Sequence, residues 1–403
     1  MPSPAHEPGH ELKALESWQR ELREQFPIIT GNPDLAYLDS AATAQKPRAV
    51  LDAVHTYLTT TNANAARGSY PWANRTTDLV ERTRDVVRHF LGDPQAGRRD
   101  ARSGVWFCGG TTDGLRAVAR DWLAGRLTDG DEILVPAADH RANLEPWLEV
   151  RRILAARGVR VTVRELPYQE SSGDYDHRAF PGVVGPRTRF VAATHVHHVH
   201  GGDMNVQRIR EAVGPDVPIC LDAAQGVGHL PLSVARLDVD FVVFSGHKAL
   251  ALPGVGAVWS RNTRGPAFRP GGWQGTPNTA GIASLEAALR WLDAAGTDRI
   301  DRWTTALAAR LTEGLRHWPA YRVLGCRSGP AVERRHGIVT FRHRDIPSDD
   351  LGFILDSRGF MVRADTLCQA GATDGQGSVR VSVHVYNTAE EIDRLLTVLG
   401  ELA

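Results

Sequence analysis

The apolar run Phe241–Ser245, which continues into Gly-His-Lys and ends at Lys248, constrains the fold more than any other stretch. A short, continuous apolar run that stops at a turn signal is typical of a β-strand buried on both faces. The chain has 47 Lys and Arg residues, and only Lys13, Lys46 and Lys248 among them are lysine. Because a lysine amine, unlike a guanidinium, can lose its proton and form a Schiff base, this placement favours chemistry at the strand end. From this stretch alone, a lysine that only extends to the rim of the sheet is the alternative.

Strand-like runs alternate with helical segments through the first two-thirds of the chain. The runs span residues 105–107, 132–136, 159–166, 189–196, 219–222, 241–245 and 254–260. This alternation predicts an α/β fold with a doubly wound, mainly parallel sheet. Helices and short strands that follow predict a smaller α+β domain. We therefore expect an N-terminal helix packed on the body (1–28), a large domain (29–282) and a small C-terminal domain (283–403), with a loop over 61–76 and a helix over 77–91.

Polar side chains follow the ends of several predicted strands. They are Thr111 and Thr112, His140, His197 and His198, Asp222 and Gln225, and Ser245, His247 and Lys248. Open α/β sheets bind ligands at the carboxyl ends of their strands, so these side chains should meet. The small and hydroxyl residues Gly109–Thr112, between a strand and a helix, suit an anion.

An aromatic nitrogen cofactor with a phosphate, pyridoxal 5′-phosphate (PLP), gives these residue types roles. Lys248 can form an imine with an aldehyde, and Asp222 can keep a pyridine nitrogen protonated. The phosphate can be bound by Thr112, Ser245 and His247, while His140 stacks on the ring. Two arginines of the small domain, Arg363 and Arg380, can hold a substrate carboxylate.

Composition excludes several other functions. The formal net charge is zero and 42% of the residues are hydrophobic, which gives no electrostatic reason to bind nucleic acid or an acidic membrane. We find no apolar run of ~20 residues and no secretory signal, and therefore expect no membrane span and a cytoplasmic protein. The four cysteines (108, 220, 326 and 368) form no CxxC pair, so we expect no zinc site.

Motifs along nearly the whole chain resemble the class V aminotransferase family of PLP enzymes, and within it the SUF-type cysteine desulfurases. They are YLDSAAT (37–43), GGTTDGLRAVA (109–119), DHRANLEPW (139–147), LDAAQ (221–225), FSGHK (244–248), GTPNTAGI (275–282), VRADTLC (362–368) and VYNTAEEIDRL (385–395). The resemblance implies fold type I and a homodimer with shared active sites. It makes Lys248 the PLP lysine, lets Gln225 reach the phenolic oxygen, and lets Thr276 reach the partner's phosphate. Arg380, with Arg363 nearby, would bind the substrate carboxylate.

The same resemblance places Cys368 at the nucleophilic cysteine of the desulfurases, where a thiolate carries a persulfide. An inert packed thiol is the alternative. Two histidines precede that cysteine in the family, and here they are Thr366 and Leu367. The family's asparagine near the cofactor is replaced by His198, a contact to substrate or cofactor. The family's HRGVH loop reads ARGSY at 66–70.

A hairpin that covers the partner's active site in SUF-type enzymes is replaced by Trp273-Gln274. A wider entrance suits a bulky substrate, so we expect a C–S lyase that acts on a cysteine with a large group on sulfur. Resemblance suggests a setting in antibiotic pathways such as lincosamide biosynthesis. The rivals are desulfuration of free cysteine through Cys368, decarboxylation-coupled oxidative deamination or transamination, and a non-catalytic scaffold.

Histidines at positions 195, 197, 198 and 200 alternate. If the strand continues through them, they divide between its two faces, and no face collects a metal-binding set. We therefore expect no metal. The remaining cysteines, Cys108, Cys220 and Cys326, are interpreted as structural.

Overall fold

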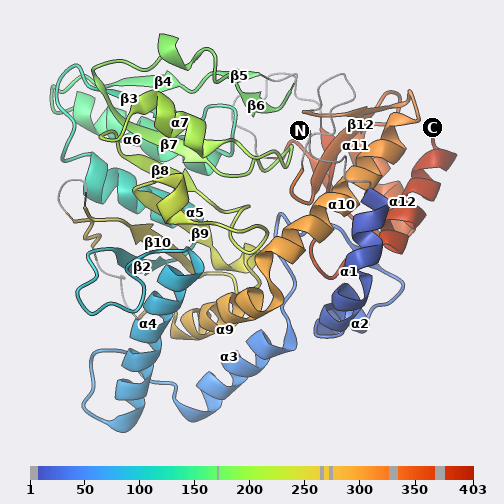
Figure 1. Ribbon diagram of the computed structural model, residues 1–403, viewed down its shortest axis with the longest axis horizontal. Coiled ribbons are helices and arrows are strands. Elements are labelled where there is room, and N and C mark those ends of the chain that lie inside the picture. Colours follow the sequence, from blue (N-terminus) through green and yellow to red (C-terminus); the bar gives the residue numbers. More distant parts are fainter. Residues whose placement is uncertain (1–7, 170–171, 264–266, 272–275, 326–334, 368–376) are drawn as a thin grey trace.

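A computed structural model of the chain describes every residue except 1–7, 170–171, 264–266, 272–275, 326–334 and 368–376. It has a large domain around a seven-stranded sheet and a small domain around a four-stranded sheet. Figure 1 shows the two side by side, with the long helix α10 (Thr297–Arg316) running from one toward the other. The candidate site lies between them.

The large sheet has the strand order β2-β10-β9-β8-β7-β3-β4. Its strands are β2 (Gly104–Cys108), β3 (Glu132–Val135), β4 (Thr162–Glu165), β7 (Thr188–Thr194), β8 (Ile219–Asp222), β9 (Phe241–Ser245) and β10 (Gly256–Ser260). The five from β4 to β9 are parallel, which confirms the predicted mainly parallel sheet. Strand β10 is antiparallel to both neighbours. The ten residues 246–255 that precede it are about the minimum for the crossover that a parallel neighbour needs.

Helices cover the faces of this sheet because its inner strands are buried on both sides; β9, for example, is buried along its whole length. They are α5 (Thr111–Ala117), which continues as a π-helix (Val118–Leu123), α6 (Glu145–Ala155), α7 (Val206–Val213) and α8 (Val234–Leu237). A short hairpin of β5 (Tyr168–Gln169) and β6 (Asp174–Tyr175) lies beyond β4 (Figure 1).

Three more helices pack together below the sheet in Figure 1: α3 (Arg48–Thr60), α4 (Pro71–Phe90) and α9 (Thr279–Ala295). The expected loop over 61–76 is wrong for its last six residues, because α4 begins at Pro71. Proline is favoured at the first position of a helix, where no intrahelical N–H is needed. The division of the chain at residues 282 and 283 stays a prediction; α9 crosses it.

The small domain confirms the predicted α+β arrangement. Its antiparallel sheet has the order β11-β12-β15-β14. The strands are β11 (Tyr321–Val323), β12 (Ile338–His343), β14 (Arg363–Asp365) and β15 (Ser378–Ser382), and the helices α11 (Ser348–Ser357) and α12 (Ala389–Glu401) accompany them. Early chain segments join this domain. Strand β1 (Ala36–Tyr37) pairs with β13 (Phe360–Met361), and α1 (Pro8–Arg23), followed by α2 (Pro27–Thr30), packs on α10.

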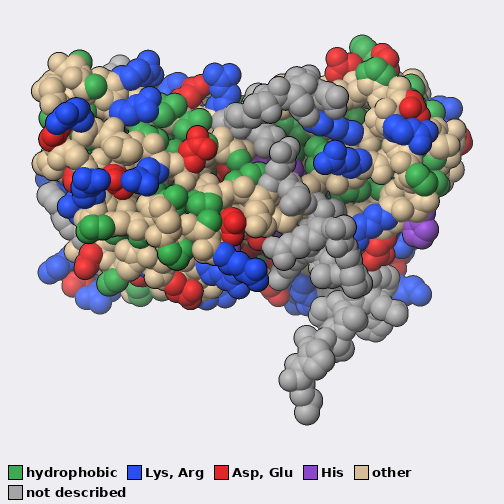
Figure 2. Space-filling view, turned by 90° about the horizontal axis from the view of Figure 1, so that it is seen from above, with side chains coloured by type: hydrophobic (Ala, Val, Ile, Leu, Met, Phe, Trp, Pro, Cys, Tyr) green, Lys and Arg blue, Asp and Glu red, His purple; other side chains and the backbone are tan. Residues whose placement is uncertain are grey.

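Two surface properties bear on function. Among the described residues, no helix has the length and apolar character needed to cross a membrane. On the face seen in Figure 2, positive and negative side chains are interspersed. This mixture agrees with the zero formal net charge of the sequence.

Candidate active site

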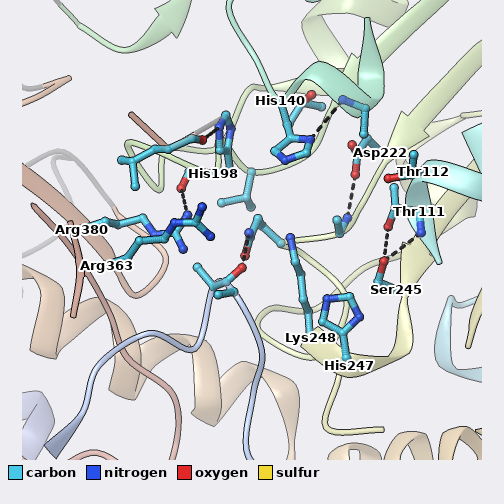
Figure 3. Close-up of a pocket in the computed structure, with 18 residues that line it drawn as sticks. Thr111, Thr112, His140, His198, Asp222, Ser245, His247, Lys248, Arg363 and Arg380 are labelled. Carbon is cyan, nitrogen blue, oxygen red and sulfur yellow. Dashed lines mark hydrogen bonds between the residues drawn. The ribbon is translucent and has the colours of Figure 1, made fainter. Parts of the chain in front are cut away.

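A cavity of about 260 Å³ opens where the carboxyl ends of the parallel strands meet the small domain (Figure 3). Of the residues predicted for the site, it is lined by Thr111, Thr112, His140, His198, Asp222, Gln225, Ser245, His247, Lys248, Arg363 and Arg380. These residues come from positions spread over 270 residues of sequence, and the two domains together bring them to one place. The remaining lining is small or apolar, including Ala41, Thr194 and Leu367.

One end of the cavity, here called the hydroxyl end, consists of Thr111, Thr112, Ser245 and His247. The Ser245 hydroxyl accepts a hydrogen bond from the Thr111 backbone N–H at 2.8 Å and bonds the Thr111 hydroxyl at 2.7 Å. This approach requires Gly110, whose φ is 150° and where a Cβ atom would lie 3.2 Å from the Ser245 oxygen. Hydroxyl groups and the N-terminal end of helix α5 thus face the cavity, an arrangement that suits an anion.

The middle of the cavity holds an amine and a carboxylic acid. Burial lowers the pKa of Lys248 to about 8, although the charge of Asp222 opposes this. Burial also raises the pKa of Asp222 to about 6, against the N–H of Ala224, which donates to its Oδ1 at 2.9 Å. In Figure 3, Lys248 extends into the cavity below the ring of His140. Burial thus disfavours the charged form of each group, and the neighbouring residues offset this effect only in part.

A hydrogen bond from the backbone holds the ring of His140 in place. Its Nδ1 accepts a hydrogen bond from the Ala142 N–H at 3.1 Å, and burial lowers the pKa of His140 to about 4. The neighbouring carboxylate of Asp139 is fully buried, receives the Tyr175 hydroxyl at 2.7 Å and lies 3.0 Å from Nε2 of His197. Sequence reasoning did not predict these contacts of Asp139, although an acid directly before a candidate catalytic histidine was the available signal.

The expected division of the histidines between two strand faces is wrong, because β7 ends at Thr194 and the histidines lie in the turn beyond it. The rings of His197 and His200 stack with centroids 4.5 Å apart, and His198 lies 5.1 Å from His197. Among the described residues, no group of three or more His, Cys, Asp or Glu side chains could hold a metal ion.

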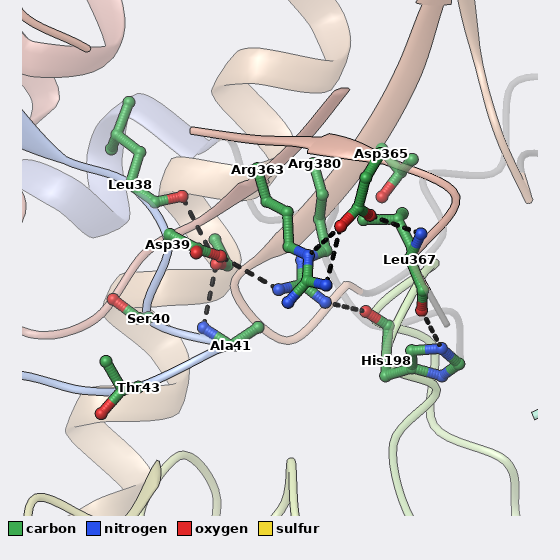
Figure 4. A network of polar contacts seen from close by, with 12 residues as sticks. Leu38, Asp39, Ser40, Ala41, Thr43, His198, Arg363, Asp365, Leu367 and Arg380 are labelled. Atoms are coloured by element: carbon green, nitrogen blue, oxygen red, sulfur yellow. Dashed lines mark hydrogen bonds and ion pairs between the residues drawn. The ribbon is translucent and has the colours of Figure 1, made fainter. Parts of the chain in front are cut away.

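The opposite end, here called the arginine end, consists of Arg363 and Arg380 with Asp39 and Asp365 (Figure 4). Nη2 of Arg380 lies 3.0 Å from Asp39, and its Nη1 donates to the His198 carbonyl at 3.2 Å. Arg363 donates through Nε to Asp365 at 2.8 Å. Burial raises the pKa of Asp39, against the effect of Arg380. Sequence reasoning predicted the arginines and missed the roles of both aspartates.

Three predicted site residues need separate comment. Nε2 of Gln225 donates to the Ala41 carbonyl at 2.9 Å, so its second hydrogen is the one left to reach a ligand. Thr276 is exposed and does not line the cavity of its own chain, so its contact with a partner's phosphate stays a prediction. Cys368 lies outside the described residues, as do Cys326 and the segment with Trp273 and Gln274.

The two described cysteines are buried, and burial raises the pKa of Cys108 to about 12 and that of Cys220 well above its usual value. High thiol pKa values agree with the structural interpretation of both.

The chemistry of the cavity fits PLP. The buried acid of Asp222 would gain a counter-charge from a protonated pyridine nitrogen, and the hydroxyl end would offer donors to a phosphate. Lys248, whose pKa is lowered to about 8, would supply the amine for the aldehyde. His140 provides a neutral ring for stacking.

Comparisons with known proteins agree with a cavity that fits PLP. The family described as "Aminotransferase class-V" matches residues 36–395. A "Probable cysteine desulfurase" of Vibrio cholerae is 31% identical, over 94% of this chain and 96% of its own. Among solved structures, the cysteine desulfurase CsdA of Escherichia coli aligns with a TM-score of 0.79 at 28% identity, covering 95% of this chain and 98% of that one. An apo cysteine desulfurase of Thermococcus onnurineus aligns with a TM-score of 0.82 at 26% identity, covering 95% and 97%.

Proposed function

The chain belongs to the class-V aminotransferase family of PLP-dependent enzymes, and we propose that it cleaves the C–S bond of a cysteine whose sulfur carries a large group. One observation supports α-amino-acid chemistry above all. The cavity places an amine, Lys248, between an acid for a pyridine nitrogen, Asp222, and two arginines suited to a carboxylate. The site thus offers a group for each part of a PLP-bound amino acid.

In this proposal, the residues of the cavity have different roles. Arg380 and Arg363 bind the α-carboxylate and orient the substrate so that its Cα–H bond points at Lys248. When bound, PLP withdraws electrons from Cα and makes that proton acidic. Lys248, with its pKa lowered to about 8, is suited to take the proton near neutral pH.

The lyase reaction balances without an oxidant. Cα loses a proton to Lys248, the electron pair forms the Cα–Cβ double bond, and the Cβ–S bond breaks to release a thiolate. The thiolate takes up a proton and leaves as a thiol. Water hydrolyses the remaining enamine to pyruvate and ammonium.

A bulky substrate is supported by two features of the sequence. Residues 269–272 run into 275–276 with only Trp273 and Gln274 between them, where SUF-type enzymes carry the covering hairpin. Thr366 and Leu367, directly before Cys368, carry no positive charge that would lower the pKa of a thiol. The relatives named cysteine desulfurases support the second candidate, desulfuration of free cysteine through a persulfide on Cys368.

The proposal includes a homodimer in the cytoplasm, in which Thr276 of each subunit reaches the phosphate held by the other. It also includes a role in specialised metabolism, where S-cysteine conjugates of larger molecules are made. Oxidative deamination coupled to decarboxylation, or transamination, of the same kind of substrate uses the same carboxylate and amine contacts.

Product analysis tests the proposal. The holoenzyme is incubated with L-cysteine and with S-substituted cysteines of increasing size, and products are identified by mass. We expect a thiol with pyruvate, and a kcat/KM that rises with the size of the sulfur substituent.

Other products would replace the proposal with a rival. Alanine with a persulfide on Cys368 identifies a desulfurase, and an aldehyde with CO₂ identifies oxidative deamination. A kcat/KM for free cysteine that equals or exceeds that of every conjugate contradicts the bulky substrate. The Cys368→Ser variant separates C–S lysis from desulfuration, because only desulfuration needs the thiol of Cys368.

A further inference from the structure

Each arginine of the arginine end is held by an aspartate, and the carboxylate of Asp365 also binds a backbone N–H. Asp39 pairs with Arg380 at 3.0 Å. Asp365 receives Nε of Arg363 at 2.8 Å and lies 2.7 Å from its Nη2, both on Oδ2. Its other oxygen, Oδ1, accepts the backbone N–H of Leu367 (Figure 4). One carboxylate thus holds a side chain and a turn together.

The turn that Asp365 holds has an unfavourable backbone. Leu367 has a φ of 56°, in the left-handed region that leucine rarely adopts. Such a conformation persists only where surrounding contacts impose it. Here the N–H of Leu367 is bound by Asp365, and its carbonyl lies 3.0 Å from Nε2 of His198 in the large domain. The side chain of Leu367 is 3% exposed, so the turn is also packed.

The contact with Leu367 determines the state of His198. Because a carbonyl can only accept, Nε2 of His198 must carry a proton. Its Nδ1 is buried and has no hydrogen-bond partner among the described residues, and burial holds the pKa of His198 well below its usual value. The ring is therefore neutral and leaves recognition of a carboxylate to the arginines. It stands at 82° to the ring of His140, with centroids 5.1 Å apart.

These contacts form a continuous path across the domain boundary. It runs from Arg363 through Asp365 and Leu367 to His198, which lies against His140 on the cofactor side (Figures 3 and 4). We propose that Asp365 is a positioning residue that, through the strained turn at Leu367, couples the carboxylate-binding Arg363 to the imidazole of His198. The inference rests on the proposed function only in taking the ligand to be an α-amino acid.

The test uses a ligand that needs no C–S cleavage. L-Alanine has the α-amino and α-carboxylate groups and no sulfur, and its binding to the holoenzyme changes the absorbance of the bound cofactor. The variants are Asp365→Ala, His198→Phe and the double variant, with Asp345→Ala as the matched control. Asp345 is an exposed aspartate of the same domain that pairs with Arg344 at 2.8 Å.

We expect Asp365→Ala to raise the half-saturating L-alanine concentration by about tenfold, the effect of losing a hydrogen bond to a charged group, and His198→Phe to raise it by about fivefold, because its lost contact with the Leu367 carbonyl joins two neutral groups. The double variant should do no worse than the stronger single variant, because both break one path. Asp365→Asn keeps an acceptor for the Leu367 N–H, so it should recover part of the loss; it also replaces Asp365→Ala if that protein does not fold. Asp345→Ala and all melting temperatures should change little.

Two results overturn the coupling. One is a half-saturating concentration within twofold of the parent for Asp365→Ala and Asp365→Asn. The other is a double variant whose effect equals the product of the two single effects, since independent sites multiply. Failure of the proposed function looks different: no S-substituted cysteine is cleaved, while L-alanine still titrates the cofactor band as expected.

Discussion

The two ends of the cavity are built on different principles. The hydroxyl end comes from one domain and is held by short contacts between neutral groups, as between Ser245 and Thr111 at 2.7 Å. The arginine end lies on the small domain, contacts the large domain through the His198 carbonyl, and is held by charged pairs, as between Arg380 and Asp39 at 3.0 Å. A neutral cradle can receive a phosphate without losing an existing ion pair. An arginine that is already paired with an aspartate must be shared between that aspartate and the carboxylate of an incoming substrate.

This difference separates two tasks. The described residues of the hydroxyl end all follow strand ends of one sheet in the large domain, so this end suits a cofactor that stays bound. The arginine end depends on how the small domain meets the large one, so it suits a substrate that comes and goes. Changes at the hydroxyl end should therefore affect retention of PLP, and changes at the arginine end should affect KM. Lys248 lies between them and should affect turnover.

The largest expected effect is that of Lys248→Ala, which removes the group that both ends serve. We expect kcat to fall by roughly 10³-fold or more, the range for loss of a positioned proton-transfer group. Both ends stay intact, so a PLP absorbance band and its response to an amino acid should persist. The matched control is Lys13→Ala, on an exposed position of α1. Full activity of Lys248→Ala would remove the basis of the mechanism.

Arg380→Ala has the next largest expected effect. It removes the proposed ligand of the substrate carboxylate and leaves Asp39 without the Arg380 side chain, so KM should rise by about 10- to 100-fold, as for a lost charged hydrogen bond. Arg380→Lys should recover little, because one ammonium cannot reproduce the fork that reaches Asp39 and the His198 carbonyl. Arg310→Ala, at a partly exposed pair with Asp393, is the control. Loss of PLP from Arg380→Ala on dialysis would break the separation between the ends.

Ser245→Ala should act in the opposite manner and more weakly. The hydroxyl is one of several donors at its end, so we expect the dissociation constant for PLP to rise by about tenfold, with KM changed less than twofold. Retention of PLP during dialysis measures this directly. Ser260→Ala, at the end of the neighbouring strand β10, should leave retention unchanged. A larger change in KM than in PLP affinity would contradict the assignment of the hydroxyl end.

The hydroxyl end was predictable from sequence because its members follow strand ends, and strand ends converge by the geometry of a parallel sheet. The run from Phe241 to Ser245 is buried as a strand, and the single 3-10 turn Gly246–Lys248 that follows it brings Lys248 to the cavity beside Ser245. The arginine end was only half predictable. Asp365 pairs with Arg363 on the same strand and also binds the N–H of Leu367, where the chain turns with a positive φ at a non-glycine residue that gives no turn signal.

The direction of a strand and the residue at which it ends could also not be predicted from the sequence pattern. An apolar run such as Gly256–Ser260 reads the same in a parallel or an antiparallel strand, and the short connection from β9 decides the direction. Alternating histidines after residue 194 resemble a continuing strand, but β7 stops at Thr194 and a turn gathers three of the rings. Here tertiary packing overrides local periodicity.

The smallest expected effect concerns pH and sharpens the description of the hydroxyl end as neutral. Burial lowers the pKa of His247 from 6.5 to about 4. Between these values the unfolded chain binds more protons than the folded one, so His247 makes the free energy of unfolding fall as pH falls from 6.5 toward 4. Asp222, raised to about 6, acts in the opposite sense below pH 6.

Replacing the histidine by a residue that does not titrate removes its share of this slope. We expect the Tm of cofactor-free His247→Gln to fall by a few degrees less than the parent's between pH 6.5 and 4.5. The exposed-site variant His55→Gln should follow the parent curve. If the two variants have the same slope, folding does not lower the pKa of His247; a protonated His247 can then attract phosphate by charge, as the arginine end attracts carboxylate.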